Sequence, residues 1–138
     1  MKRILIAILV GLVAVSAAFA YYVIENEKKE ELTENATVNV TLIINFGNET
    51  EWQFGLTLDE KNATVFYALL KAANENGFNV EYTYYGQYDS YFVDSIAGAG
   101  GDGKFWIYYV NGVMGEVGAD KKVVGEGDMI EWRLEEFS

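Results

Sequence analysis

The chain has 138 residues with 10 Lys+Arg and 21 Asp+Glu, a formal net charge of −11 at pH 7. Such an acidic chain lacks the positive surface that releases counterions from phosphate, which excludes nucleic-acid binding and argues against docking to anionic lipid. The sequence contains no Cys and no His. It therefore has no disulfide, lipoprotein anchor or thiolate chemistry, and it lacks the commonest general base and transition-metal ligand.

Residues 1–24 have the pattern of an export signal. Lys2-Arg3 precede an uncharged run from Ile4, and small residues at Ala18 and Ala20 match a cleavage site. The run also continues to Ile24, long enough to span a bilayer as a helix with the N-terminus in the cytoplasm. Both alternatives, a cleaved signal peptide and a retained single-helix anchor, predict an extracellular location for the rest of the chain.

Residues 25–36 mix Glu and Lys without apolar periodicity, which predicts a charged stalk. The domain is predicted to occupy residues 37–138. From Val38 to Phe46 apolar and polar residues alternate, Gly47-Asn48 interrupts the pattern, and alternation resumes from Trp52 to Leu58. A period of two predicts a strand with one wet face, so this segment is expected to form a hairpin.

The period then changes to that of a helix. Thr64 is placed to act as the N-cap, Val65, Leu69 and Ala72 share one helical face, and Gly77 is suited to end the helix in a left-handed conformation. The sequence therefore predicts one helix over residues 65–76.

The second half of the chain is predicted to be extended. A Tyr-rich stretch over residues 80–96 is interrupted at Gly86, and the Gly-rich residues 98–103 are expected to form a flexible connector. An aromatic strand over residues 104–110 then runs into Asn111-Gly112, which favours a type I′ turn because both central positions need positive φ. A final strand follows Gly127-Asp128. One helix and one mixed or antiparallel sheet that bury each other's apolar faces make a two-layer α+β domain.

The order ββαββ with a Gly-Asp turn before the last strand resembles the β-grasp fold. The motifs Trp106-x-Tyr108-x-Val110-Asn111-Gly112, Gly118-Ala119-Asp120 and Gly127-Asp128 through Trp132 resemble the transcobalamin-like C-terminal domain family, over roughly residues 38–134. The resemblance implies a β-grasp-like domain that binds a ligand or partner. Cobalamin, the ligand of vertebrate members, is not carried over, because this chain lacks the large helical domain that forms the other half of that site.

Asn-x-Thr occurs four times, more often than the composition predicts by chance. In an exported protein this triplet is the acceptor for N-glycosylation. The alternative is that Asn and Thr serve turns and wet strand faces. The predicted acceptors are Asn35, Asn39, Asn48 and Asn62.

A cluster of aromatic residues is the candidate ligand-binding surface. Tyr combines a large apolar face with a polar tip, so binding surfaces favour it. The alternative is that many of these side chains are core, since aromatic residues also suit strands. The surface is expected at a Tyr-rich sheet edge beside the loop 98–103, with these contributors: Tyr82, Tyr84, Tyr85, Tyr88, Trp106, Tyr108 and Asn111.

No catalytic or metal-binding constellation is expected. Asp89, Asp94 and Asp102 lack the spacing of a calcium loop, and the other prominent acidic residues fall at predicted turns. The sequence thus favours an exported, non-enzymatic domain without a cofactor that binds an unidentified small molecule, glycan or surface protein. The alternative is a structural or adhesive protein that assembles through an exposed sheet edge.

Overall fold

The computed structural model describes residues 36–137. The predicted signal or anchor over residues 1–24, nearly all of the stalk and the Asn35 acceptor lie outside this range. Within the described part of the chain, no helix is long and apolar enough to cross a bilayer.

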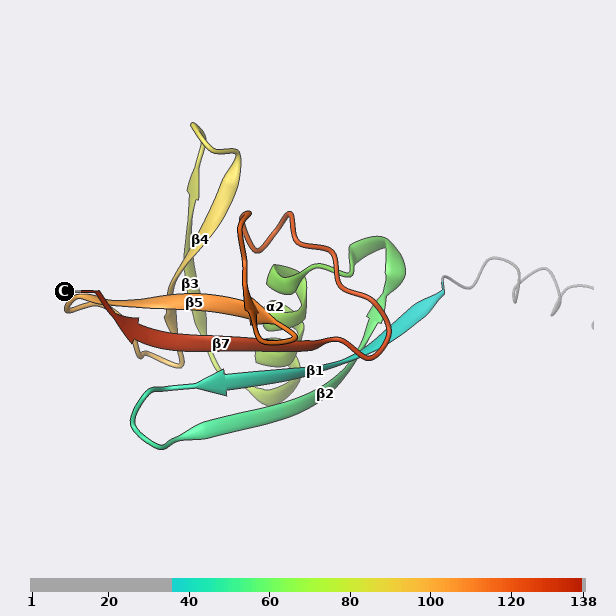
Figure 1. The fold of residues 1–138 in the computed structure, drawn as a ribbon, viewed down its shortest axis with the longest axis horizontal. Helices are drawn as coiled ribbons and strands as arrows, with labels where there is room; N and C mark the ends of the chain where they lie inside the picture. The colour runs from blue at the N-terminus through green and yellow to red at the C-terminus, as the bar shows by residue number, and fades with distance from the viewer. Residues whose placement is uncertain (1–35, 138) are drawn as a thin grey trace, which may run out of the picture. The chain divides into compact units, whose positions relative to one another are not determined.

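A mixed five-stranded sheet forms one layer of the domain (Figure 1). The strand order is β2-β1-β7-β5-β6, with β1 and β7 parallel and the other neighbours antiparallel. The strands are β1 (Thr37–Asn45), β2 (Glu51–Asp59), β5 (Lys104–Val110), β6 (Val113–Met114) and β7 (Met129–Glu136). The predicted α+β, β-grasp-like architecture is therefore confirmed.

The helix α2 (Val65–Asn76) packs its apolar side against this sheet. The Thr64 hydroxyl accepts a hydrogen bond from the Tyr67 N–H at 3.2 Å, and Gly77 ends the helix at φ 72° with its N–H donated to the Ala73 carbonyl. Both caps satisfy backbone groups that the helix cannot satisfy internally. The predicted helix and its two end signals are confirmed. A short 3-10 helix, η1 (Glu60–Asn62), precedes it.

The core lies between α2 and the sheet. Val65, Leu69 and Ala72 are fully buried on the helix, as the periodicity predicted. They meet the inward residues of the central strands, which alternate with exposed ones because successive strand side chains point to opposite faces. The sheet contributes chiefly Val40, Leu42, Ile44, Leu56, Leu58, Trp106, Tyr108, Ile130 and Trp132.

The Asn111-Gly112 turn between β5 and β6 has the predicted conformation, with φ of 50° and 81°. The Asn111 side chain donates to Asp128 Oδ1 and accepts from the Met129 N–H, each at 2.9 Å. These bonds tie the turn to the Gly127-Asp128 turn that starts β7. The two turns that carried much of the family resemblance are therefore one hydrogen-bonded unit.

The Tyr-rich segment does not form an edge of the main sheet. It makes a separate two-stranded hairpin of β3 (Val80–Tyr85) and β4 (Ser90–Ile96), which projects beyond the β5 side of the sheet (Figure 1). A register shift between Glu81 and Tyr82 marks a bulge near its base. Bulges bend and twist a strand pair, which suits a hairpin that departs from the sheet.

Candidate binding groove

The hairpin divides the predicted tyrosine cluster between its two faces. Tyr82, Tyr84 and Tyr91 share the face that meets Phe66 of α2. The rings of Phe66 and Tyr91 are stacked with centroids 5.1 Å apart, and Tyr82 meets Phe66 edge-on at the same distance. The ring centroid of Tyr84 lies 5.1 Å from that of Tyr91. This face holds the hairpin against the helix, because aromatic pairs at such distances are favourable contacts.

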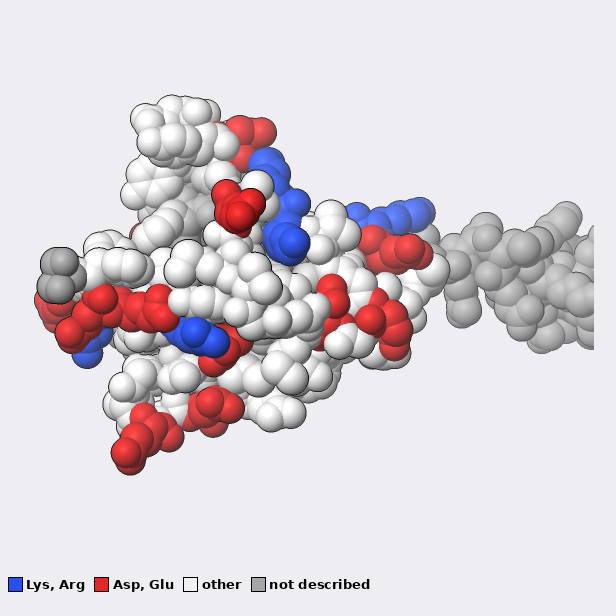
Figure 2. Space-filling view, in the orientation of Figure 1, with Lys and Arg blue, Asp and Glu red and all other residues white. Residues whose placement is uncertain are grey.

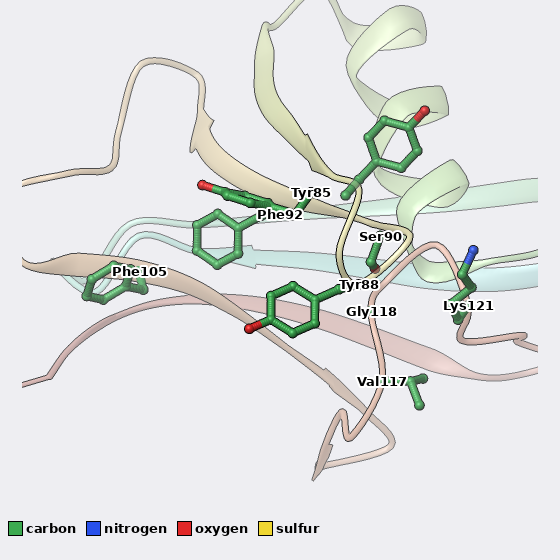
Figure 3. A pocket seen from close by; sticks show the side chains of 9 residues that line it. Tyr85, Tyr88, Ser90, Phe92, Phe105, Val117, Gly118 and Lys121 are labelled. Carbon is green, nitrogen blue, oxygen red and sulfur yellow. The ribbon is translucent and has the colours of Figure 1, made fainter.

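The opposite face of the hairpin forms one wall of a groove of about 750 Å³. Figure 3 shows the rings of Tyr85, Tyr88, Phe92 and Phe105 gathered along one side of it. Tyr85 and Phe92 come from β3 and β4, Tyr88 from the turn between them, and Phe105 from the outward side of β5. All four rings are exposed, and Tyr88 retains 71% of its surface. Figure 2 shows the hairpin almost free of charged side chains, with charged groups gathered on one side of it.

The other wall is the loop over residues 115–121, which contributes Val117, Gly118 and Lys121 (Figure 3). This loop touches the hairpin at Gly118, where an added Cβ would lie 1.8 Å from the Ser90 Oγ. Only glycine fits such a close approach of backbone to side chain. The contact sets the separation of the two walls at this point.

Asp120 fastens the hairpin to the loop. Its Oδ1 accepts hydrogen bonds from the Ser90 hydroxyl at 2.6 Å and from the Tyr91 N–H at 3.2 Å. Partial burial alone would raise the pKa of Asp120. The hydrogen bonds from Ser90, Tyr91 and Lys121 outweigh that effect and hold the pKa below the ordinary 3.8. The charged carboxylate is thus the form that the folded structure stabilises.

Lys121 and Asp89 add a second, more exposed link at the same place. The Lys121 Nζ lies 3.2 Å from Asp120 Oδ2 and 3.5 Å from Asp89 Oδ2. Asp89 also accepts from the Tyr84 hydroxyl at 2.6 Å. That hydrogen bond, followed by the charge of Lys121, lowers the pKa of Asp89, and the same bond raises the pKa of Tyr84. The Asp120 hydrogen bond raises the pKa of Lys121.

The groove therefore combines aromatic walls with a single cationic side chain. Its only hydroxyl-bearing aliphatic residue is Ser90, which donates to Asp120. Among residues 36–137 no three acidic side chains gather as a metal site would require. Such a surface is suited to bind a flat apolar group through stacking and burial.

Two predicted ligand-binding residues lie in the core instead. Trp106 and Tyr108 are 3% and 7% exposed. The Trp106 indole N–H donates to the Ala99 carbonyl at 2.8 Å, and the Tyr108 hydroxyl donates to the Val117 carbonyl. The alternation of β5 explains the error, because it turns Trp106 and Tyr108 toward α2 and leaves Phe105 outside. Burial raises the pKa of Tyr108.

Two other predicted components lie away from the groove. Asn111 is exposed, but both ends of its side-chain amide are engaged in the turn unit described above. Residues 98–103 follow β4 at the end of the hairpin opposite its Tyr88 tip, and residues 98–102 line a different, polar hollow. They make two tight turns, with Ala99 N–H donating to the Ile96 carbonyl and Lys104 N–H to the Gly101 carbonyl. The expectation that this loop lies beside the tyrosine surface was wrong.

Phe92, Phe105, Val117 and Lys121 are among the groove residues that the sequence analysis missed. Phe92 and Phe105 could have been found from the alternation of strand side chains. Each is adjacent to a core residue, Val93 or Trp106, and must therefore point to the opposite face of its strand. Val117 and Lys121 carried no local signal, because a long-range contact of their loop brings them to the hairpin.

The three described glycosylation candidates differ in their surroundings. Asn48 lies in the β1–β2 turn with its Oδ1 accepting the Thr50 N–H at 3.2 Å. Asn39 lies within β1, where its amide nitrogen donates to Glu126 at 3.2 Å and its oxygen accepts the Thr57 hydroxyl at 2.8 Å. Asn62 is exposed at the end of η1. All three side chains reach the surface, but that of Asn39 is held at both ends.

A family model described as a domain of unknown function, DUF4430, matches residues 62–136, more than half of the chain. The chain belongs to the DUF4430 family. The match includes α2, the hairpin, the loop 115–121 and every residue that lines the groove. No curated protein matches the chain.

Two solved structures show that the fold of this DUF4430 protein recurs. Haptocorrin, in its complex with Cbi, is similar with a TM-score of 0.63 and 18% identity over 75% of this chain. The chain corresponds to only 26% of haptocorrin's length. A candidate metal-binding protein from Ruminococcus gnavus has a TM-score of 0.58 and 22% identity, covering 73% of this chain and 99% of that one. The resemblance to transcobalamin-like C-terminal domains is thereby confirmed at the level of the fold.

Proposed function

We propose that this DUF4430 protein is an exported, non-enzymatic binding domain whose groove holds the flat apolar part of a small molecule. The observation that carries the proposal is the set of four exposed rings, from Tyr85, Tyr88, Phe92 and Phe105, along one hollow. Apolar groups gathered in a concavity are the usual feature of ligand sites, whereas isolated exposed ones are common on any surface.

The construction of the groove supports binding by a preformed site. The hairpin is held by Phe66 on one face and by Asp120 at its turn end, so the rings are positioned before a ligand arrives. Preorganisation of this kind lowers the entropic cost of association. The structure of a fold relative, haptocorrin, in complex with Cbi is consistent with a binding role.

The chemistry of the lining supports a non-enzymatic role. Ser90 is the one aliphatic hydroxyl in the groove, and its partner is a carboxylate whose lowered pKa makes it a weak base. The sequence holds no His that could accept the proton in its place. A nucleophile normally needs such a base, so binding without turnover is the function this lining suits best.

Replacing Tyr85 with alanine tests the groove directly. The probe is anilinonaphthalene sulfonate, which has flat apolar rings. We expect its fluorescence to rise on binding, and its dissociation constant to increase about tenfold in Tyr85→Ala, since a lost aromatic contact costs roughly 1–1.5 kcal/mol.

Tyr82→Ala is the matched control. Tyr82 lies on the same strand, and its 46% exposure nearly equals the 47% of Tyr85, but it points to Phe66. We expect this variant to lose much less dye affinity than Tyr85→Ala, because it removes no ring from the groove and the stacking of Phe66 on Tyr91 still holds the hairpin. Equal dye affinity in all three proteins would contradict the proposal.

Export is part of the proposal, and it rests on the sequence of residues 1–24. In a secretory pathway that glycosylates, Asn48 is the expected acceptor. It lies at an exposed turn and its side-chain oxygen accepts the Thr50 N–H, which leaves the amide nitrogen out of that bond, whereas glycosylation of Asn39 would break the bond of its amide nitrogen to Glu126. Glycan mass on protein secreted from yeast checks this: Asn48→Gln should lose a glycan and Asn39→Gln should not. The reverse pattern would show that the turn is not the acceptor.

A further inference from the structure

We propose that the outer edge of β2 is a second interaction surface, which captures an extended, basic polypeptide segment of another protein by adding it to the sheet. Strand addition of this type obtains affinity from main-chain hydrogen bonds and specificity from pockets for alternate side chains. The surface is separate from the aromatic groove and does not depend on the proposed ligand.

The first observation is that β2 has an open edge. It is nine residues long and stands last in the strand order, and within residues 36–137 no strand pairs with its outer side (Figure 1). Native sheets usually protect such an edge with Pro, a bulge, charged side chains, especially Lys, or short length. The charged residues of β2, Glu51 and Asp59, stand only at its two ends; between them its register with β1 is unbroken and it contains no Pro, Lys or Arg.

The second observation is that the backbone groups of this edge point outward. The ladder between β1 and β2 is closed by a bond from the Phe46 N–H to the Thr50 carbonyl at one end and from the Glu60 N–H to the Ala36 carbonyl at the other. Hydrogen-bonded and non-bonded pairs alternate along an antiparallel ladder. The backbone groups of the even-numbered residues of β2 therefore point to β1, and those of the odd-numbered residues point outward. Of these, Asp59 is half-buried and the others are exposed: Glu51, Gln53, Gly55 and Thr57.

The third observation is a hollow beside this edge for an apolar side chain. It has a volume of about 570 Å³ and lies where β2 meets the end of α2. Trp52, Phe54 and Phe78 form its aromatic lining, with the rings of Phe54 and Phe78 stacked at 5.7 Å. An added strand would direct every second side chain to this face. One apolar residue at the right position would enter the hollow and contact its rings.

The charges on the edge select the partner. Glu51 and Asp59 are the charged residues of β2, and Glu49 and Glu60 flank it. Figure 2 shows acidic side chains only beside the β1–β2 turn. If the β2 strands of two copies paired antiparallel with Gly55 opposite Gly55, Glu51 of each copy would lie opposite Asp59 of the other. Like charges directly opposite each other destabilise strand pairing. A segment with Lys or Arg beside apolar residues complements these charges, so a basic partner is favoured over self-assembly.

Gly55 allows a sharp test. Its N–H points outward and an added Cβ would meet no atom within 4 Å, so Gly55→Ala leaves the edge intact. Gly55→Pro removes that N–H and puts a ring in the path of the incoming strand, while the ladder to β1 keeps its bonds. The probe is a phage-displayed library of random decapeptides, selected on the full chain.

We expect the selected peptides to combine alternating apolar residues with Lys or Arg. They should bind Gly55→Ala like the unmodified chain and Gly55→Pro at least tenfold more weakly, and they should shift the amide resonances of Gln53 and Thr57. Glu51→Lys does not alter the backbone and should lower the affinity for the same peptides about two- to fivefold. It replaces the proline variant as the test if that variant fails to fold. Failure to enrich any peptide, peptides unaffected by both substitutions, or a dimer of the chain that Gly55→Pro dissociates would each overturn the proposal.

Discussion

Asp120→Ala is expected to lower the free energy of unfolding by about 2–3 kcal/mol and to release the hairpin from the loop 115–121. The substitution removes the acceptor of the Ser90 hydroxyl and the Tyr91 N–H, and hydrogen bonds to a charged acceptor are worth about 1.5–3 kcal/mol. Since these bonds set one wall of the groove, dye affinity should fall as well. Chemical denaturation and the fluorescence titration measure the two effects.

Asp120→Asn is the control, because its amide oxygen can still accept from Ser90 and Tyr91 and only the charge is lost. Its effect on the free energy of unfolding should be under half that of Asp120→Ala.

The pH dependence of stability supplies a second check. The folded-state pKa of Asp120 is lowered. Its contribution to the free energy of unfolding is therefore fully present above about pH 4 and is lost as the pH falls through the folded-state pKa. Acid should therefore destabilise the unmodified chain more than either variant; equal acid sensitivity would show that Asp120 does not hold the hairpin.

Gly115→Ala is expected to cost about 3 kcal/mol, the upper end of ordinary overpacking penalties. An added Cβ at Gly115 would lie 2.0 Å from Cζ of Tyr108, and that ring is buried with its hydroxyl bonded to Val117. The ring cannot move aside without disturbing both the core and a groove residue. Thermal denaturation should show a fall of more than 10 °C in the melting temperature.

Gly125→Ala is the matched control for this substitution, since a Cβ there meets no atom within 4 Å and its φ is not positive. We expect it to be nearly neutral. In a Tyr108→Leu background, Gly115→Ala should become nearly neutral too, because the clashing ring atoms are gone, and the double-mutant cycle would report that coupling. An additive cycle would contradict the assignment of Tyr108 to the core.

The local features of this fold could be read from the sequence. Thr64 and Gly77 bound the helix because their chemistry suits its two ends, and Asn111-Gly112 forms its turn because both positions need positive φ. Each signal acts over a few residues, so distant parts of the chain do not override it. The order of these elements predicted an α+β domain, and the parallel pairing of β1 with β7 makes its sheet mixed.

The candidate site was only partly predictable, for a physical reason. Tyr85 and Tyr88 were assigned to the candidate surface and are exposed, whereas Trp106 and Tyr108 were assigned to the same surface and are buried. Which phase of an alternating aromatic strand faces the core depends on where the helix packs. The opposite wall depends on contacts between residues about 30 apart, such as Ser90 and Asp120, and no local pattern marks them.

Native mass spectrometry of the chain isolated from its own cells tests the binding proposal most directly. We expect a noncovalent mass on the unmodified chain that survives in Tyr82→Ala and is lost in Tyr85→Ala, with the fold of both variants confirmed by circular dichroism. A bound molecule retained by Tyr85→Ala, or lost equally from both variants, would contradict the assignment of the groove as the binding site.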